Sequence, residues 1–175
     1  MSVRIASSNL NQTPLDWIGN LNNIRESIKI AKDNSVDVLC LPELSITGYG
    51  CQDLFYHDWF IQKSDNILEE IRLLTKSITV IVGHPLSFNE KRYNSCCIIR
   101  NQKILGFFIK SNLPNDGIHY EKRWFEGWEY GKVDKFNFLN QYYPIGNFQI
   151  EYDNNLTLGF EICRDMWDEE RPANY

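Results

Sequence analysis

The sequence predicts an α/β layered fold, in which helices pack against a sheet, and three observations lead to that prediction. First, the apolar residues change their period along the first half of the chain, from alternating or continuous runs to repeats of three or four residues. Second, the resulting segments follow in the order strand, helix, strand, helix, strand. Third, residues 36–41 form a short run that is apolar except for Asp37 and stops at Pro42, which is typical of a strand covered on both faces.

The first half of the chain supplies these five elements in order. Residues 3–10 begin as an alternating apolar run and are expected to form a strand. After a turn at Thr13 and Pro14, a helix is predicted by the apolar residues Trp17, Leu21, Ile24, Ile28 and Ala31. The strand at residues 36–41 comes next. A second helical face follows at Phe60, Ile67, Ile71 and Leu74, and then a strand at residues 78–83.

The pattern changes in the second half. Residues 94–100 and 103–109 flank Asn101 and Gln102, which predicts a tight hairpin. Residues 111–134 are rich in Gly, Pro, Asn and aromatic side chains and show little periodicity. Long irregular segments inside compact domains are often functional. Residues 145–150 and 156–162 are expected to resume as strands.

Composition narrows the class of protein. The 175 residues are most simply one domain, and a content of 43% hydrophobic and 14% aromatic residues fits a globular protein. A formal net charge of -5 provides no basic footprint, so no nucleic-acid partner is expected. No apolar run approaches the roughly 18 residues of a membrane span. The first ten residues lack the features of a signal peptide, so we expect a cytoplasmic protein without a membrane partner.

The cysteines and histidines indicate no metal site. The five cysteines are an odd number without CxxC spacing, which predicts neither a disulfide framework nor zinc binding; they are Cys40, Cys51, Cys96, Cys97 and Cys163. The three histidines have no HxxxH or HxxE partner and are expected in packing or surface roles; they are His57, His84 and His119.

Three reactive side chains follow three of the expected strands. Glu43 comes after residues 36–41, Lys110 after residues 103–109, and Cys163 after residues 156–162. In open α/β sheets, sites form outside the carboxyl ends of the strands. A free thiol is only about 3% thiolate at pH 7, so a nucleophilic cysteine needs a base or a positive neighbour. Glu43 is suited to take the proton, and Lys110 and the backbone N–H groups after Cys163 are suited to stabilise a carbonyl oxyanion.

Each of these residues also has an ordinary structural explanation. Free cysteines are among the most buried residue types. A glutamate after a proline at a strand end can cap the chain or face water, and a lysine at a strand end is usually solvated. Spacing alone therefore leaves both interpretations open.

Three segments together resemble the nitrilase superfamily of carbon–nitrogen hydrolases. LPELSITGYG (residues 41–50) is similar to its glutamate motif, IKSNLP (residues 109–114) to its lysine motif, and FEICRDMW (residues 160–167) to its cysteine elbow. The resemblance implies a four-layer α-β-β-α sandwich. It also implies Glu43 as general base, Lys110 as oxyanion stabiliser and Cys163 as nucleophile. A further acid acts beside the triad in this family in a context like YEKRWF (residues 120–125), where Glu121 matches it.

A narrower resemblance lies in residues 112–131 and in the pair Arg171 and Pro172. These are most similar to the amino-terminal glutaminase domain of glutamine-dependent NAD synthetases. The resemblance implies that glutamine is the substrate and that ammonia passes to a synthetase domain of the same chain, with the full-length form a homo-oligomer. It implies no cofactor for the glutaminase domain, and ATP and Mg only in the synthetase domain, where nicotinic acid adenine dinucleotide is amidated.

The resemblance also implies that residues 1–175 are the N-terminal part of the glutaminase domain. No Gly-rich ATP loop of the SGGxDS type occurs, so the synthetase domain is expected to be absent from this chain. The sandwich of the family has further strands after the cysteine elbow. We therefore expect a fold truncated after the elbow and weak or no activity of these residues alone. The inner sheet face is expected to be left partly uncovered; its residues are Val38, Leu41, Val80, Val82, Leu158 and Phe160.

Two positions depart from the pattern of the subfamily. Arg164 stands where the residue after the nucleophile is often acidic, and Asp116 stands where an aromatic residue is common. The backbone N–H of Arg164 is still expected to donate to the oxyanion. Asp116 is a candidate contact for the ammonium group of glutamine or an ordinary solvated loop residue.

Three other functions remain open at this level. One is a stand-alone amidase or nitrilase that uses the same triad on another substrate. Another is a papain-like hydrolase with one of the three histidines as base, although no papain-type signature surrounds Cys163. The third is a non-catalytic scaffold derived from a glutaminase.

Overall fold

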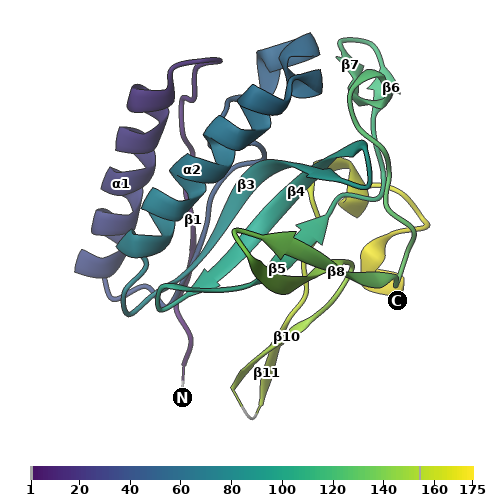
Figure 1. The fold of residues 1–175 in the computed structure, drawn as a ribbon. Coiled ribbons are helices and arrows are strands. Elements are labelled where there is room, and N and C mark those ends of the chain that lie inside the picture. Colours follow the sequence, from purple (N-terminus) through teal and green to yellow (C-terminus); the bar gives the residue numbers. More distant parts are fainter. Residues whose placement is uncertain (1, 154) are drawn as a thin grey trace.

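A seven-stranded mixed sheet forms the centre of the computed structural model, which describes residues 2–153 and 155–175 (Figure 1). The strand order is β1-β2-β3-β4-β5-β9-β8. The strands are β1 (Ile5–Ser7), β2 (Val38–Cys40), β3 (Thr79–Phe88), β4 (Lys91–Arg100), β5 (Lys103–Ile109), β8 (Val133–Phe138) and β9 (Gln141–Gly146). Two short hairpins lie outside this sheet: β6 (Asn115–Asp116) with β7 (His119–Tyr120), and β10 (Ile150–Asp153) with β11 (Leu156–Leu158).

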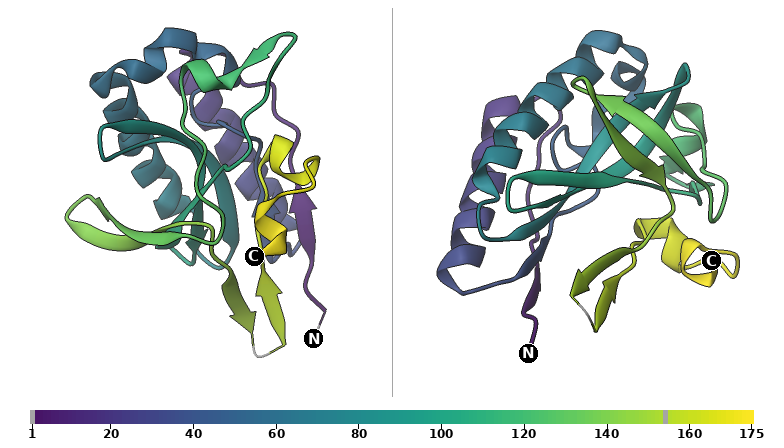
Figure 2. Two further views of the ribbon diagram at one scale, coloured as in Figure 1. Left: turned by 90° about the vertical axis from the view of Figure 1, so that its right-hand side faces the viewer. Right: turned by 60° about the horizontal axis from the view of Figure 1, so that its bottom comes forward.

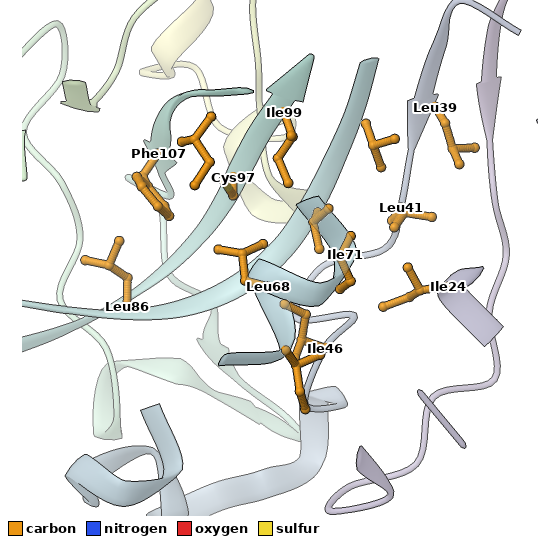
Figure 3. Packing of buried hydrophobic residues seen from close by; sticks show 14 of the residues in the cluster. Ile24, Leu39, Leu41, Ile46, Leu68, Ile71, Leu86, Cys97, Ile99 and Phe107 are labelled. Atoms are coloured by element: carbon orange, nitrogen blue, oxygen red, sulfur yellow. The ribbon is translucent and has the colours of Figure 1, made fainter. Parts of the chain in front are cut away.

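Helices α1 (Trp17–Asp33) and α2 (Asp58–Leu74) cover one face of the sheet (Figure 1). The side chain of Asp16 caps the first helix by accepting from the N–H of Gly19 at 2.9 Å. Both helices were predicted. Of the apolar residues that predicted α1, Leu21, Ile24, Ile28 and Ala31 are buried against the sheet and α2, and Trp17 is half-buried. Figure 3 shows this core, in which residues of the helices meet residues of the strands: Ile24, Leu68 and Ile71 against Leu39, Leu41, Cys97 and Ile99.

Three two-residue turns build the antiparallel part of the sheet. In each turn both central residues have positive φ, as type I′ hairpin turns require; they are Asn89 and Glu90, Asn101 and Gln102, and Leu139 and Asn140. The hairpin at Asn101 and Gln102 was predicted. The third strand was predicted to end at residue 83, but it continues to Phe88. Pro85 is tolerated there because β2 pairs with β3 only through Ile81, which leaves that side of the strand without a partner.

The last third of the chain differs most from the prediction. The expected strand at residues 145–150 is split, because β9 ends at Gly146 and the chain leaves the sheet before β10 begins at Ile150. The expected strand at residues 156–162 shortens to β11, which pairs only with β10. Cys163 therefore does not follow a strand of the main sheet. It opens a 3₁₀ turn, Cys163–Met166, five residues beyond the end of the β10–β11 hairpin.

The face of the sheet opposite the helices carries this hairpin and the segment after it (Figure 2). Val38, Ile81, Ile98 and Phe108 from the sheet are buried there with Ile162, and Leu158 and Phe160 pack against them. The expectation for the uncovered face was wrong for three other residues. Leu41, Val80 and Val82 belong instead to the core between the sheet and the helices. Leu41 is labelled there in Figure 3.

Over residues 2–153 and 155–175, no helix combines the length and the apolar character that crossing a bilayer requires.

A close approach of two backbones places the loop that follows β2. Beyond Leu41 the loop turns across β3, and the N–H of Ile46 donates to the carbonyl of Gly83. A Cβ atom at Gly83 would lie 2.3 Å from both the nitrogen of Leu44 and the oxygen of Pro42. Only glycine fits at this crossing.

Gly83→Ala should therefore lower the free energy of unfolding by roughly 3 kcal/mol, because the added methyl group meets backbone atoms that cannot move aside. Gly159→Ala is the matched control: its Cβ would meet nothing within 4 Å. We expect that control to stay within about 0.5 kcal/mol of the parent protein. Urea unfolding measures both, and equal stability of the two variants would contradict the close approach.

Candidate active site

Lys110 is the centre of a buried ionic cluster at the end of β5. Its side chain has no exposed surface. Its Nζ donates to Glu43 Oε1 at 2.6 Å and to both carboxylate oxygens of Glu121 at 2.9 Å. Burial by itself would lower the pKa of Lys110, but the charges of Glu43 and Glu121 outweigh it, and the pKa is raised. Lys110 is therefore an ammonium ion whose three donors all point to carboxylate oxygens.

Glu43 reaches Lys110 from the loop after β2. Because β2 is parallel to β3, and β3 and β5 are each antiparallel to β4, the carboxyl ends of β2 and β5 lie at the same edge of the sheet. Leu44, with a φ of 49°, turns the chain directly after Glu43. Glu43 Oε1 also accepts from Nδ2 of the buried Asn94 at 2.6 Å, so one oxygen of Glu43 takes two hydrogen bonds.

Glu121 is the second carboxylate of the cluster and has no exposed surface. Burial raises its pKa, as does the nearby charge of Glu43, while Lys110 acts in the opposite direction. The hydroxyl of Tyr49 donates to Glu121 Oε1 at 2.6 Å. The 3₁₀ turn Glu121–Arg123 that carries this acid is tied to the loop of Tyr49, because Arg123 donates to both oxygens of Asp53 at 2.8 Å.

Cys163 lies near the same edge of the sheet, in the segment that packs on the face opposite the helices. It shares with Glu43 a pocket of about 370 Å³ that is lined by β2, β3, β4 and the segment after β11. Cys163 is exposed and has a φ of 49°, in the left-handed region that is strained for a residue with a side chain. Such strain is concentrated at functional sites and is a feature of nucleophile turns. Partial burial raises the pKa of the thiol, the charge of Glu43 raises it further, and Lys110 lowers it.

The charges of this cluster favour general-base chemistry over a standing thiolate. One ammonium ion faces two carboxylates, so the cluster is negative before the thiol ionises, and another negative charge is unfavourable. Transfer of the thiol proton to Glu43 leaves the net charge of the group unchanged. The arrangement is therefore suited to a cysteine that loses its proton to Glu43 only as it attacks.

Asp116 and Arg164 are not brought into the ionic cluster. Asp116 lies exposed in the β6–β7 hairpin and is not among the residues that line the pocket of Cys163. The side chain of Arg164 donates to both oxygens of Asp168, at 2.9 and 3.1 Å. Their proposed contacts with a substrate stay predictions, as does the backbone donor at Arg164.

The three histidines lie apart from Cys163. Within the described part of the chain, no histidine lines the pocket that Cys163 shares with Glu43. His84 is buried and its Nε2 lies 2.9 Å from Asp65 Oδ1 on α2. His57 is exposed at the start of α2, and His119 contacts the Tyr49 hydroxyl at 3.4 Å. This placement disfavours a papain-like cysteine–histidine pair.

The sequence-based prediction missed three buried or half-buried polar residues of the site. Asn94 begins the expected strand at residues 94–100, and a polar residue at the start of an apolar run was a usable signal. Tyr49 lay inside the glutamate motif and Asp165 inside the cysteine motif. Asp165 is fully buried. An acid two residues after the candidate nucleophile, directly behind an apolar run, was a signal in the sequence.

Lys110→Met should destabilise the protein by about 3–5 kcal/mol at neutral pH, because it leaves the buried carboxylate of Glu121 and the half-buried carboxylate of Glu43 without a cation. The loss should shrink as the pH falls. A carboxyl group whose folded pKa lies above its unfolded value withdraws stability at high pH and not at low pH, where it is protonated in both states.

The double variant Lys110→Met with Glu121→Gln removes one of the two stranded charges and should recover part of the loss. Urea unfolding of both variants at several pH values measures these effects. A loss for Lys110→Met that does not change with pH would show that the cluster is held by packing alone.

A family model and known proteins match this chain over nearly its whole length. The family model for carbon–nitrogen hydrolases matches residues 4–172. A glutamine-dependent NAD(+) synthetase of Homo sapiens is 34% identical over 97% of this chain and 26% of its own length. One of Oryza sativa subsp. indica is 38% identical over 97% of this chain and 24% of its own length. The chain thus spans about a quarter of these relatives.

Solved structures give the same result. A glutamine-dependent NAD(+) synthetase from Cytophaga hutchinsonii matches with a TM-score of 0.90 and 40% identity, over 93% of this chain and 28% of that one. An amidase from Nesterenkonia sp. has a TM-score of 0.65 at 21% identity, over 77% of this chain and 51% of its own, and shows the shared fold. The predicted nitrilase-like α/β fold is confirmed, and the chain belongs to the carbon–nitrogen hydrolase family.

Proposed function

We propose that this chain is the glutamine-hydrolysing part of a glutamine-dependent NAD synthetase. Cys163 is its nucleophile, Glu43 its general base and Lys110 the cation that stabilises the oxyanion. The observation that supports this proposal best is that segments far apart in the sequence meet at one sheet edge. There Cys163 and Glu43 share a pocket and Lys110 is 2.6 Å from Glu43. Glutamine is the favoured amide substrate because the relatives are glutamine-dependent NAD(+) synthetases.

The reaction begins when Glu43 takes the proton of the Cys163 thiol and the sulfur attacks the side-chain amide carbon of glutamine. A tetrahedral oxyanion forms, and Lys110 and a backbone N–H after Cys163 stabilise it. The protonated Glu43 then gives its proton to the leaving nitrogen and ammonia departs. Water activated by Glu43 hydrolyses the thioester, which releases glutamate and restores the thiol.

The geometry of the site constrains how Lys110 acts in these reaction steps. Its three donors are used by Glu43 and Glu121 in the resting site, and its side chain is fully buried. When Glu43 is protonated by the thiol, its attraction for the ammonium ion weakens. The positive charge of Lys110 is then less neutralised at the moment when the oxyanion forms. Glu121 keeps the ammonium group in place during this change.

The ammonia released is proposed to serve a synthetase domain that amidates nicotinic acid adenine dinucleotide. ATP and Mg would be used by that domain and not by residues 1–175. Asp116 remains the candidate contact for the ammonium group of the substrate. A homo-oligomeric full-length protein and a cytoplasmic location belong to the same proposal.

In the full-length protein, Cys163→Ala should lower glutamine-dependent NAD synthesis by about 10⁴-fold, because the nucleophile is lost. Synthesis from added ammonium salt should be unchanged, because the thiol serves only to release ammonia. Both activities are measured as NAD formed with glutamine or ammonium as the nitrogen source.

Cys40→Ala is the matched control, since Cys40 is a second thiol that lines the same pocket. It should keep most of the glutamine-dependent activity. Loss of both activities in Cys163→Ala would assign Cys163 a structural role. A variant that still used glutamine would overturn the proposal.

A further inference from the structure

A fully buried carboxylate next to Cys163 takes no part in the chemistry proposed above. Asp165 is two residues beyond Cys163, in the same 3₁₀ turn, and has no exposed surface. Buried aspartates without a cation partner are rare, because removing the charge from water is unfavourable unless hydrogen bonds replace the water. The contacts of Asp165 show what replaces it.

All three hydrogen bonds that Asp165 accepts come from the backbone. Oδ1 accepts from the N–H of Ser111 at 3.1 Å and of Asn112 at 2.7 Å, and Oδ2 accepts from the N–H of Ile162 at 3.0 Å. Ser111 and Asn112 directly follow Lys110, and Ile162 directly precedes Cys163. One carboxylate thus bridges the chain just after the lysine and the chain around the nucleophile.

No strand pairing makes this connection within the described residues. Lys110 follows β5 of the main sheet, whereas Cys163 follows β11, which pairs only with β10. The segment that carries Cys163 packs on the sheet through apolar side chains such as Phe160 and Ile162. Apolar contacts do not fix a position along the sheet as directional hydrogen bonds do.

We infer that Asp165 is a positioning residue: its ionised carboxylate holds the cysteine turn in place against the end of the lysine strand, and its protonation releases the turn. The inference extends the proposed glutaminase function and rests on it. A carboxylate is needed because three N–H donors converge. An amide would place its NH₂ group opposite one of those N–H groups, and a protonated carboxyl group accepts more weakly at the oxygen that carries the proton.

The protonation state of Asp165 is poised to change in mildly acidic solution. Burial raises its pKa, and the backbone hydrogen bonds and Lys110 lower it, with the result that the pKa is raised from 3.8 to about 6. The charged or titratable groups that face it are Lys110 from the end of β5, Cys96 from β4, and Tyr130 from the loop before β8. Arg164 and Asp168 flank it in sequence and pair with each other.

The test uses the full-length protein with Asp165→Asn. The asparagine oxygen can still accept from Ser111 and Asn112, but its NH₂ group faces the N–H of Ile162. We expect the glutamine-dependent kcat to fall about 10–100-fold at pH 8, with KM for glutamine nearly unchanged and ammonium-dependent synthesis unaffected.

The pH dependence separates positioning from a merely structural role. As the pH falls through about 6, Asp165 of the parent protein becomes protonated, so the ratio of parent to variant kcat should shrink toward one. Asp168→Asn is the matched control, because it removes a neighbouring carboxylate whose side-chain hydrogen bonds, within the described residues, go to Arg164. The ratio of parent to this control should be constant with pH.

Amide hydrogen exchange of the unmodified protein gives a second measurement that does not depend on the variant folding. After correction for the intrinsic exchange rate, the N–H groups of Ser111, Asn112 and Ile162 should lose protection together below about pH 6. Protection that persists there, or a ratio of kcat values that does not change with pH, overturns the inference. Failure of the proposed function is distinguishable, because Cys163→Ala would then keep glutamine-dependent synthesis.

Discussion

The ammonium group of Lys110 is the constraint on which the rest of the site depends. A charge without solvent exposure is stable only if opposite charges and hydrogen bonds surround it. Lys110 obtains them from Glu43, which is 67 residues away in the sequence, and from Glu121, which is 11 residues away beyond the β6–β7 hairpin. The segments that carry these two acids must therefore end at the same edge of the sheet. The glycine at position 83 and the Arg123–Asp53 pair are the local means by which they do so.

The thiol of Cys163 and the ammonium group of Lys110 differ in solvent exposure. Lys110 is sealed inside the protein, whereas Cys163 is exposed in a strained turn at the rim of the pocket. Glu43 lies between these extremes, with 17% of its side chain exposed. One of its oxygens is held by Lys110 and Asn94. The second oxygen is thereby oriented by two fixed bonds on the first, as a base that transfers a proton repeatedly requires.

Much of the fold was predictable from the sequence, because local periodicity records which face of an element is buried. The apolar stripe of α1 and the continuous run of β2 led to correct elements. Glu43 and Lys110 were found because the carboxyl ends of parallel strands share one edge. The route of the chain to Cys163 was not predictable. Residues 145–162 are apolar enough for sheet strands, and only tertiary packing shows that they leave the sheet at Gly146 and cross its other face. Asn94 and Asp165 were missed for a related reason. The partner of Asn94 is Glu43, and two of the partners of Asp165 are Ser111 and Asn112, all more than 50 residues away in the sequence.

The raised pKa of Cys163 has a consequence for the lifetime of the protein. Peroxides and other electrophiles attack the thiolate and hardly touch the thiol, so the rate of damage follows the thiolate fraction. An exposed cysteine that was permanently ionised would be oxidised steadily while it waited for a substrate. Here partial burial and the Glu43 charge keep the proton on the sulfur. The same carboxylate that is proposed to remove the thiol proton thus disfavours the oxidation-prone thiolate in the resting site.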